Sequence, residues 1–203
     1  MLNIQKPRTM KLAVVTKPTF FIEEDKIITR LFEEELDYLF LDKSYPHPQY
    51  IERLLNLIPK KYHKRIFTCN NRLMQDYKLA GQLFPPGSPH PTEKQSGKLV
   101  GYAANLKELY EFKGFYEIMC FGPMGRTFHQ SAELNEYGKK VINKRVWAFG
   151  DIDEGNLKRL ASYGFGGVIL DAQVWNRFDS CRSTDYSELM DSFKKIQKLA
   201  KKL

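Results

Sequence analysis

Cysteine is scarce in this chain of 203 residues. Its three cysteines, Cys69, Cys120 and Cys181, are widely spaced, with no Cys-x-x-Cys pair and no metal-type His/Cys spacing. This pattern excludes a disulfide framework and a zinc module, and it predicts reduced thiols in a cytoplasmic protein. Cys69 and Cys120 end predicted strands, so we expect them to be buried apolar residues and not nucleophiles.

Long apolar runs are also missing. The first run, Leu12 to Val15, contains only four residues. A membrane-spanning helix needs about 20 apolar residues. We therefore expect no secretory leader, no membrane span and no membrane partner.

Basic charge is concentrated at the C-terminus. The formal net charge is +8, and residues 194–203 hold five lysines and no acid, which leaves +3 for the rest of the chain. We expect these lysines to form the solvated face of a last helix. Its buried side would be formed by Tyr186, Leu189, Met190, Phe193, Ile196 and Leu199. No basic stripe interleaved with aromatic residues is present, so nucleic acid is not an expected partner.

Short β-rich runs alternate with helical patterns from residue 10 onward. The predicted strands are 12–16, 37–41, 65–69, 81–84, 99–103, 116–121, 145–149 and 167–170. A helical pattern follows each strand except the fourth, where the proline-rich run 85–91 cannot continue a helix. This alternation predicts an α/β fold with one (β/α)8 TIM barrel over residues 10–203, preceded by a polar arm at 1–9. The alternative, a doubly wound open sheet, needs a glycine-rich turn after the first strand, and none is present at 15–19.

Residues 145–171 form the clearest strand, helix, strand unit. The intervening segment 153–163 begins with Asp153 as the expected cap and stops at Gly164. A parallel crossover brings both strand ends to one rim, where backbone N–H groups favour phosphate. We expect Gly150 and Gly167 either to contact such a phosphate or only to allow tight turns between strand and loop.

Several segments at the predicted strand ends have a recognisable order and spacing. They are 39–43, 70–72, 101–105, 121–127, 148–152, Asn156, Gly164 and 167–170. In these segments the chain resembles the thiamine phosphate synthase family, also called thiamine-phosphate pyrophosphorylase, and its relative thiazole tautomerase. The resemblance extends over nearly the whole chain from Met10. It implies a transferase that joins an aminopyrimidine methyl diphosphate to a thiazole phosphate and releases diphosphate with Mg2+ assistance.

The resemblance also implies a substrate-binding set, while the catalytic residues stay unknown. The set is Lys43, Asn70, Asn71, Arg126, Thr127, Gly150 and Gly167. Lys43 and Arg126 would serve as substitute cations, because Asp42 and Ser44 stand where the family has cationic residues. Asn71 stands where the family has an aspartate that binds Mg2+. An amide keeps an oxygen ligand there but lacks the negative charge that favours a hard cation.

Other positions leave the activity open. Asp151 and Asp171 replace neutral donors at the phosphate rim, where they would repel an anion or act as caps. The alternatives are a non-catalytic barrel that binds a small ligand, an enzyme of altered chemistry that uses Arg126, His129 and Asp151, and a thiazole tautomerase-like isomerase. In each case the expected partner is a small phosphorylated molecule, and a homodimer is left open.

Overall fold

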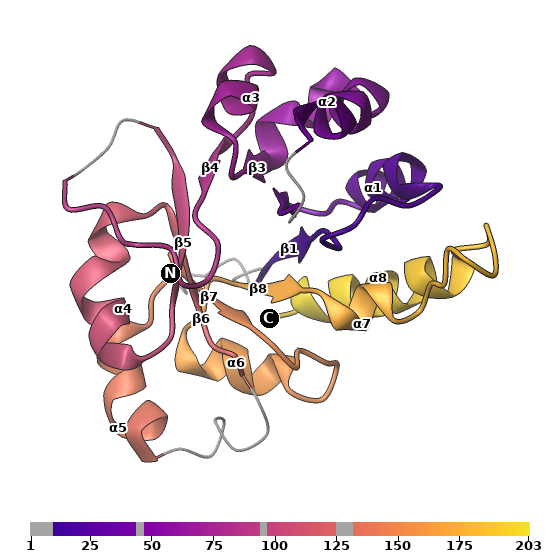
Figure 1. The fold of residues 1–203 in the computed structure, drawn as a ribbon. Helices are drawn as coiled ribbons and strands as arrows, with labels where there is room; N and C mark the ends of the chain where they lie inside the picture. The colour runs from indigo at the N-terminus through magenta and orange to yellow at the C-terminus, as the bar shows by residue number, and fades with distance from the viewer. Residues whose placement is uncertain (1–9, 44–46, 94–96, 125–131) are drawn as a thin grey trace, which may run out of the picture.

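The computed structural model describes residues 10–43, 47–93, 97–124 and 132–203, and its eight strands close into one parallel barrel in chain order (Figure 1). The strands are β1 Lys11–Val15, β2 Tyr38–Leu41, β3 Ile66–Thr68, β4 Gly81–Leu83, β5 Leu99–Ala103, β6 Ile118–Phe121, β7 Val146–Phe149 and β8 Gly167–Leu170. The predicted (β/α)8 barrel is confirmed, and the open sheet is excluded because β8 pairs with β1.

The helices surround the strands. They are α1 Glu24–Glu33, α2 Pro48–Leu57, α3 Asn71–Asp76, α4 Leu106–Phe112, α5 Ala132–Val141, α6 Leu157–Tyr163, α7 Ala172–Trp175 and α8 Ser187–Ala200, with short 3-10 helices η1 Lys60–Arg65 and η2 Lys113–Phe115. Within the described ranges, no helix combines the length and apolarity needed to span a membrane.

Side-chain alternation along the strands divides the core into two parts. One set of strand residues fills the barrel interior: Ala13, Phe40, Phe67, Leu83, Val100, Ile118, Cys120, Trp147 and Ile169. The alternate set points outward and packs under the helices. Inward and outward side chains alternate along every strand, and we call the positions of the inward ones the inward phase. Continued past the end of a strand, this phase determines which of the following residues face the barrel axis.

The last helix buries its predicted apolar side. Leu189, Met190, Phe193 and Ile196 are buried in α8, and Tyr186 and Leu199 pack against the same core. The lysines lie on the opposite, solvated side, as the periodicity predicts.

The connection from β4 to β5 has no helix among its described residues, as the proline-rich run predicts (Figure 1). The side chain of His90 anchors this connection instead. Its ring nitrogens lie 2.8 Å from the Tyr116 hydroxyl and 3.1 Å from Glu108 Oε1, and its ring stacks on Phe112. Polar anchoring and ring stacking thus replace helix packing on this side of the barrel.

The helix after β7 starts later than the sequence pattern predicts. Asp153 is not the cap of a helix: its carboxylate accepts a hydrogen bond from Asn156 N at 2.9 Å, while Asn156 Oδ1 accepts from Asp153 N at 3.0 Å. These reciprocal bonds close a turn, and α6 begins only at Leu157. The predicted stop is confirmed, since Gly164 adopts φ +93°.

Gly101 tests the outward packing of β5. A Cβ at this position would lie 2.3 Å from Cε1 of Tyr116, a buried ring that is also held by His90. We expect Gly101→Ala to lower the free energy of unfolding by about 1–3 kcal/mol, because the ring has no room to move. Urea denaturation measures the change. Gly114→Ala is the matched control, since nothing lies within 4 Å of its Cβ, and an equal loss in both variants would contradict the packing argument.

Candidate functional site

Polar side chains gather at the carboxyl ends of the strands, a region that we call the mouth. Asp42, Cys69 and Asp171 continue the inward phase beyond β2, β3 and β8, and Tyr102 is the last inward residue of β5. Cys69 Sγ lies 3.8 Å from Asp42 Oδ1. Tyr102 interacts electrostatically with Asp42, Cys69 and Asp171, so these groups share one space.

Hydrogen bonds and a ring contact connect the strand ends that form the mouth. Thr16 Oγ1 donates to the carbonyl of Asp42 at 2.9 Å and accepts from Asp42 N at 3.1 Å, which links the ends of β1 and β2. Tyr102 contacts the ring of Phe149 edge-on, with 5.0 Å between centroids. The mouth therefore presents an aromatic floor surrounded by polar groups.

Burial controls the charge of these groups. Desolvation raises the pKa of the Asp42 carboxyl, and it raises that of Asp171 although this residue is exposed overall; Lys17 partly offsets the shift at Asp171. Desolvation, with the Asp42 charge, raises the pKa of the Cys69 thiol to about 12. Cys69 is therefore a neutral thiol at physiological pH and a poor nucleophile.

The two strand-end cysteines differ in burial. Cys120 is fully buried, as predicted, and lies against the hydroxyl of Tyr102. The expectation of burial is wrong for Cys69, which is exposed overall even though the surrounding protein desolvates its thiol. The reason is its place one residue beyond the end of β3, where the barrel opens.

Lys43, predicted as a substitute cation, is enclosed in the protein. Its Nζ donates to the carbonyls of Lys17 at 2.9 Å and Thr19 at 3.0 Å, and to Glu24 Oε1 at 2.5 Å. Its side chain is 0% exposed. Three acceptors use all three ammonium protons. Lys43 thus holds the loop between β1 and α1 in place and is not available as a cation for a substrate.

Glu24 is the buried partner of Lys43. Its Oε2 atom is buried without a hydrogen-bond partner, and desolvation raises the pKa of this carboxyl to about 7. Desolvation also lowers the pKa of Lys43. Because folding raises the pKa of Glu24 from its ordinary value of 4.5, the contribution of this group to stability is fully present below pH 4.5 and is lost as the pH rises through about 7.

Asn70 and Asn71 occupy the start of α3. Asn70 caps the helix, because its Oδ1 accepts from Leu73 N at 3.1 Å. Asn71 is exposed as the first helical residue. Among the described residues, no group of three or more His, Cys, Asp or Glu side chains could hold a metal ion. The one amide at Asn71 does not supply the charge that Mg2+ requires, so the described residues do not fit the implied Mg2+ site.

The two predicted glycines lie at opposite ends of the barrel. Gly150 follows β7 at the mouth with φ +89°, and a Cβ there would lie 2.7 Å from Met124 N, so the backbone itself requires glycine. Gly167 is the first residue of β8 and pairs with Lys11 and Trp147. The prediction that Gly167 contacts a substrate at the mouth is therefore wrong, because this residue lies at the amino end of its strand.

The remaining predicted positions give mixed outcomes. Arg126, Thr127 and His129 lie outside the described residues. The cap role expected for Asp171 is wrong, since its side chain makes no cap bond to α7. Asp151 is exposed, and its carbonyl accepts from the Asn156 side chain at 2.6 Å.

Tyr102, Lys17 and Asp42 lie at the mouth but were not among the predicted substrate-binding residues. Each stands at or just after a predicted strand, where the inward phase of the alternation could have identified it. The partner of Lys43 carried no such signal, because Glu24 lies on a helix 19 residues away.

The Lys43 and Glu24 pair can be tested by a double-mutant cycle. We expect Glu24→Gln or Lys43→Met alone to lower the free energy of unfolding by about 3 kcal/mol, since each leaves a buried group without its partner. The double variant should lose at least about 1 kcal/mol less than the sum of the single losses. Denaturant titration measures all four proteins.

The pair Glu23 and Lys26 at the start of α1, in which the Lys26 side chain is 62% exposed and that of Glu23 17%, is the matched control. Its cycle, Glu23→Gln with Lys26→Met, should give a coupling of about 0.5 kcal/mol or less. Equal coupling in the two cycles would show that Lys43 and Glu24 behave as a surface pair.

Comparison with known proteins gives a result for solved structures only; no protein-family model and no curated protein matches the chain. Thiamine phosphate pyrophosphorylase from Bacteroides thetaiotaomicron is 39% identical, with a TM-score of 0.82, and the match covers 94% of this chain and 98% of that one. Thiamine phosphate pyrophosphorylase from Pyrococcus furiosus is 16% identical, with a TM-score of 0.71 and coverage of 95% and 96%. At 13% identity and a TM-score of 0.57, 3-hexulose-6-phosphate synthase from Salmonella typhimurium shares the fold alone, over 94% of this chain and 98% of that one.

The first of these matches extends over almost the full length of both chains, and its 39% identity is well above the 13% of the structure that shares only the fold. It confirms the resemblance seen in the strand-end segments. The chain belongs to the thiamine phosphate pyrophosphorylase family.

Proposed function

We propose that this protein is a transferase of the thiamine phosphate synthase type. It would join an aminopyrimidine methyl diphosphate to a thiazole phosphate and release diphosphate. The observation that carries the proposal is the 39% identity, over 94% of the chain, to a protein named for this activity. The place of the reaction would be the mouth, because TIM barrels carry their active sites at the carboxyl ends of the strands.

The reaction breaks the bond between the pyrimidine methylene carbon and a diphosphate oxygen, which leaves with the electron pair. The thiazole nitrogen then uses its lone pair to form the new carbon–nitrogen bond. The methylene gains positive charge between these events, and nearby carboxylates stabilise such charge. Asp42 and Asp171 are inward-facing carboxylates of the mouth, and the rings of Tyr102 and Phe149 offer a flat surface for a heterocycle.

The departing diphosphate needs positive charge, and the described part of the mouth offers little. Lys17 is the cation beside Asp171, but its Nζ also lies 3.4 Å from the carbonyl of Phe178. Lys43 is enclosed by its own partners. This shortage favours a second candidate, a barrel that binds a thiamine precursor without joining the two.

One experiment separates the two candidates. The purified protein is incubated with both precursors and Mg2+, and thiamine phosphate is measured by chromatography after oxidation to thiochrome. In parallel, the thermal midpoint is followed with each precursor alone. Product above the protein-free background supports the transferase. Stabilisation by a precursor without product supports the binding barrel. If the protein gives neither product nor stabilisation, both candidates are rejected.

Asp171 tests the charge of the mouth. We expect Asp171→Asn to tighten binding of thiazole phosphate by about 3-fold to 10-fold at pH 7, because like charges ~4 Å apart repel by about 1 kcal/mol where water screens them. The raised pKa of Asp171 makes this advantage shrink as the pH falls, since the wild-type carboxyl becomes neutral. Calorimetric titration at pH 7 and pH 5 measures the ratio of affinities.

The exposed Asp191 on α8 provides the control for this change. Asp191→Asn should leave the affinity unchanged at both pH values. An advantage of Asp171→Asn that is absent at pH 7, or that grows toward pH 5, would contradict the assigned role of Asp171.

A further inference from the structure

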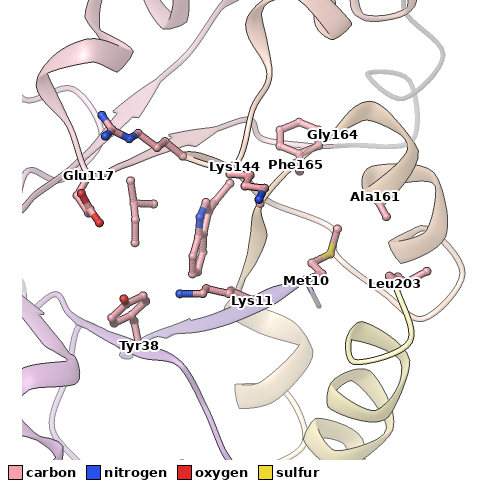
Figure 2. Close-up of a pocket in the computed structure, with 13 residues that line it drawn as sticks. Met10, Lys11, Tyr38, Glu117, Lys144, Ala161, Gly164, Phe165 and Leu203 are labelled. Atoms are coloured by element: carbon pink, nitrogen blue, oxygen red, sulfur yellow. The ribbon is translucent and has the colours of Figure 1, made fainter. Parts of the chain in front are cut away.

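A concave space lies at the end of the barrel opposite the mouth. This cavity, which we call the basal cavity, has a volume of about 510 Å³ and is lined mainly by residues at the amino ends of the strands, including Lys11, Tyr38, Lys144, Arg145 and Trp147 (Figure 2). Small-molecule sites in proteins commonly have volumes of roughly 300–1,000 Å³. The basal cavity therefore has room for a ligand of moderate size.

The lining of the basal cavity is mainly cationic. Lys11 begins β1, and Lys144 and Arg145 precede β7, so three cations from two segments line the cavity together with one carboxylate, that of Glu117. In the described part of the chain, none of these four side chains forms an ion pair. The carboxylate of Asp37 lies outside the lining but interacts electrostatically with Lys11. Figure 2 shows Lys11 reaching over Tyr38, and its Nζ lies 5.6 Å from the ring centroid. The charge favours an anion.

Trp147 gives the basal cavity a flat wall and a hydrogen-bond donor. The residue is 2% exposed, and its ring occupies the space that a side chain at Gly167 would need, since a Cβ there would lie 2.6 Å from the indole. Trp175 donates its indole N–H to the carbonyl of Val15 at 2.7 Å. Within the described ranges the indole N–H of Trp147 has no acceptor, and Trp147 is one of the residues that line the cavity.

These features together describe a ligand. The lysines and the arginine, which form no ion pair in the described ranges, would bind an anionic group. The indole N–H of Trp147 would donate to a hydrogen-bond acceptor, and the rings of Trp147 and Tyr38 would stack on a planar group. We propose that the basal cavity is a second binding site, separate from the mouth, for a small molecule that carries a planar ring and an anionic group. Glu117 limits the negative charge that such a ligand can carry.

Two probes of this chemistry test the proposal on the full chain. Adenosine monophosphate and 2-naphthalenesulfonate each combine a planar ring with an anion, whereas adenosine and inorganic phosphate each lack one part. Calorimetry should show binding of at least one combined probe. Its affinity should exceed that of adenosine and of phosphate by about 10-fold or more, because charge-assisted hydrogen bonds contribute roughly 1.5–3 kcal/mol each.

Variants then locate the binding. The double change Lys144→Gln with Arg145→Gln should weaken the bound probe by about 10-fold or more. Lys158→Gln with Lys195→Gln removes two exposed lysines elsewhere and should change nothing. Glu117→Gln should tighten the probe by about 3-fold, since it removes a like charge. Asp171→Asn at the mouth should have no effect.

Fluorescence gives an independent measurement through Trp147. A bound probe should quench the emission of the wild type, and Trp147→Phe should lose this response while Trp175 still emits. Absence of binding by both combined probes at millimolar concentration would overturn the proposal. So would binding that the Lys144 and Arg145 changes leave unaltered in proteins with a normal thermal midpoint.

Discussion

Closure of the parallel barrel is the constraint on which the rest of this structure depends. The pairing of β8 with β1 joins residues from the two ends of the chain, from Lys11 opposite Gly167 to Val14 opposite Leu170. In the closed barrel every strand has a neighbouring strand on both sides, and only every second side chain of a strand points toward the barrel axis. The interior aromatic core, the polar mouth and the basal cavity all follow from this inward phase.

The closed barrel gives its two ends different chemistry. At the mouth the inward phase ends in Asp42, Cys69, Tyr102 and Asp171, so carboxylates and neutral donors face one another. At the base, Lys11 and Tyr38 begin their strands with the same phase, and Lys144 and Arg145 lie beside them. A packed layer of side chains separates the two ends, because Phe40, Phe67, Cys120 and Trp147 belong to one interior cluster.

Ion pairs have different roles in the fold according to their burial. The pair between Lys43 and Glu24 is enclosed where the loop after β1 meets the end of β2, and both of its pKa values shift in the direction that desolvation dictates. It organises the wall of the mouth at an electrostatic cost. The exposed pairs along α1, such as Arg30 with Glu33 and Glu34, adjust the surface and contribute little to stability.

Local patterns in the sequence determined the elements and the family. Alternating β-rich and helical runs gave the (β/α)8 order, the proline-rich run 85–91 accounts for the missing helix, and Gly164 ends α6 as glycine commonly does. The strand-end segments were sufficient to identify the family, because they occur in a characteristic order along the chain. Only the tertiary structure decided what individual side chains do. Lys43 looked like a free cation until Glu24 was placed beside it, and Gly167 looked like a rim residue until the register placed it at the base. Spacing along the chain determines periodicity and turns, whereas burial, partners and the end of the barrel that a residue occupies depend on contacts between distant segments.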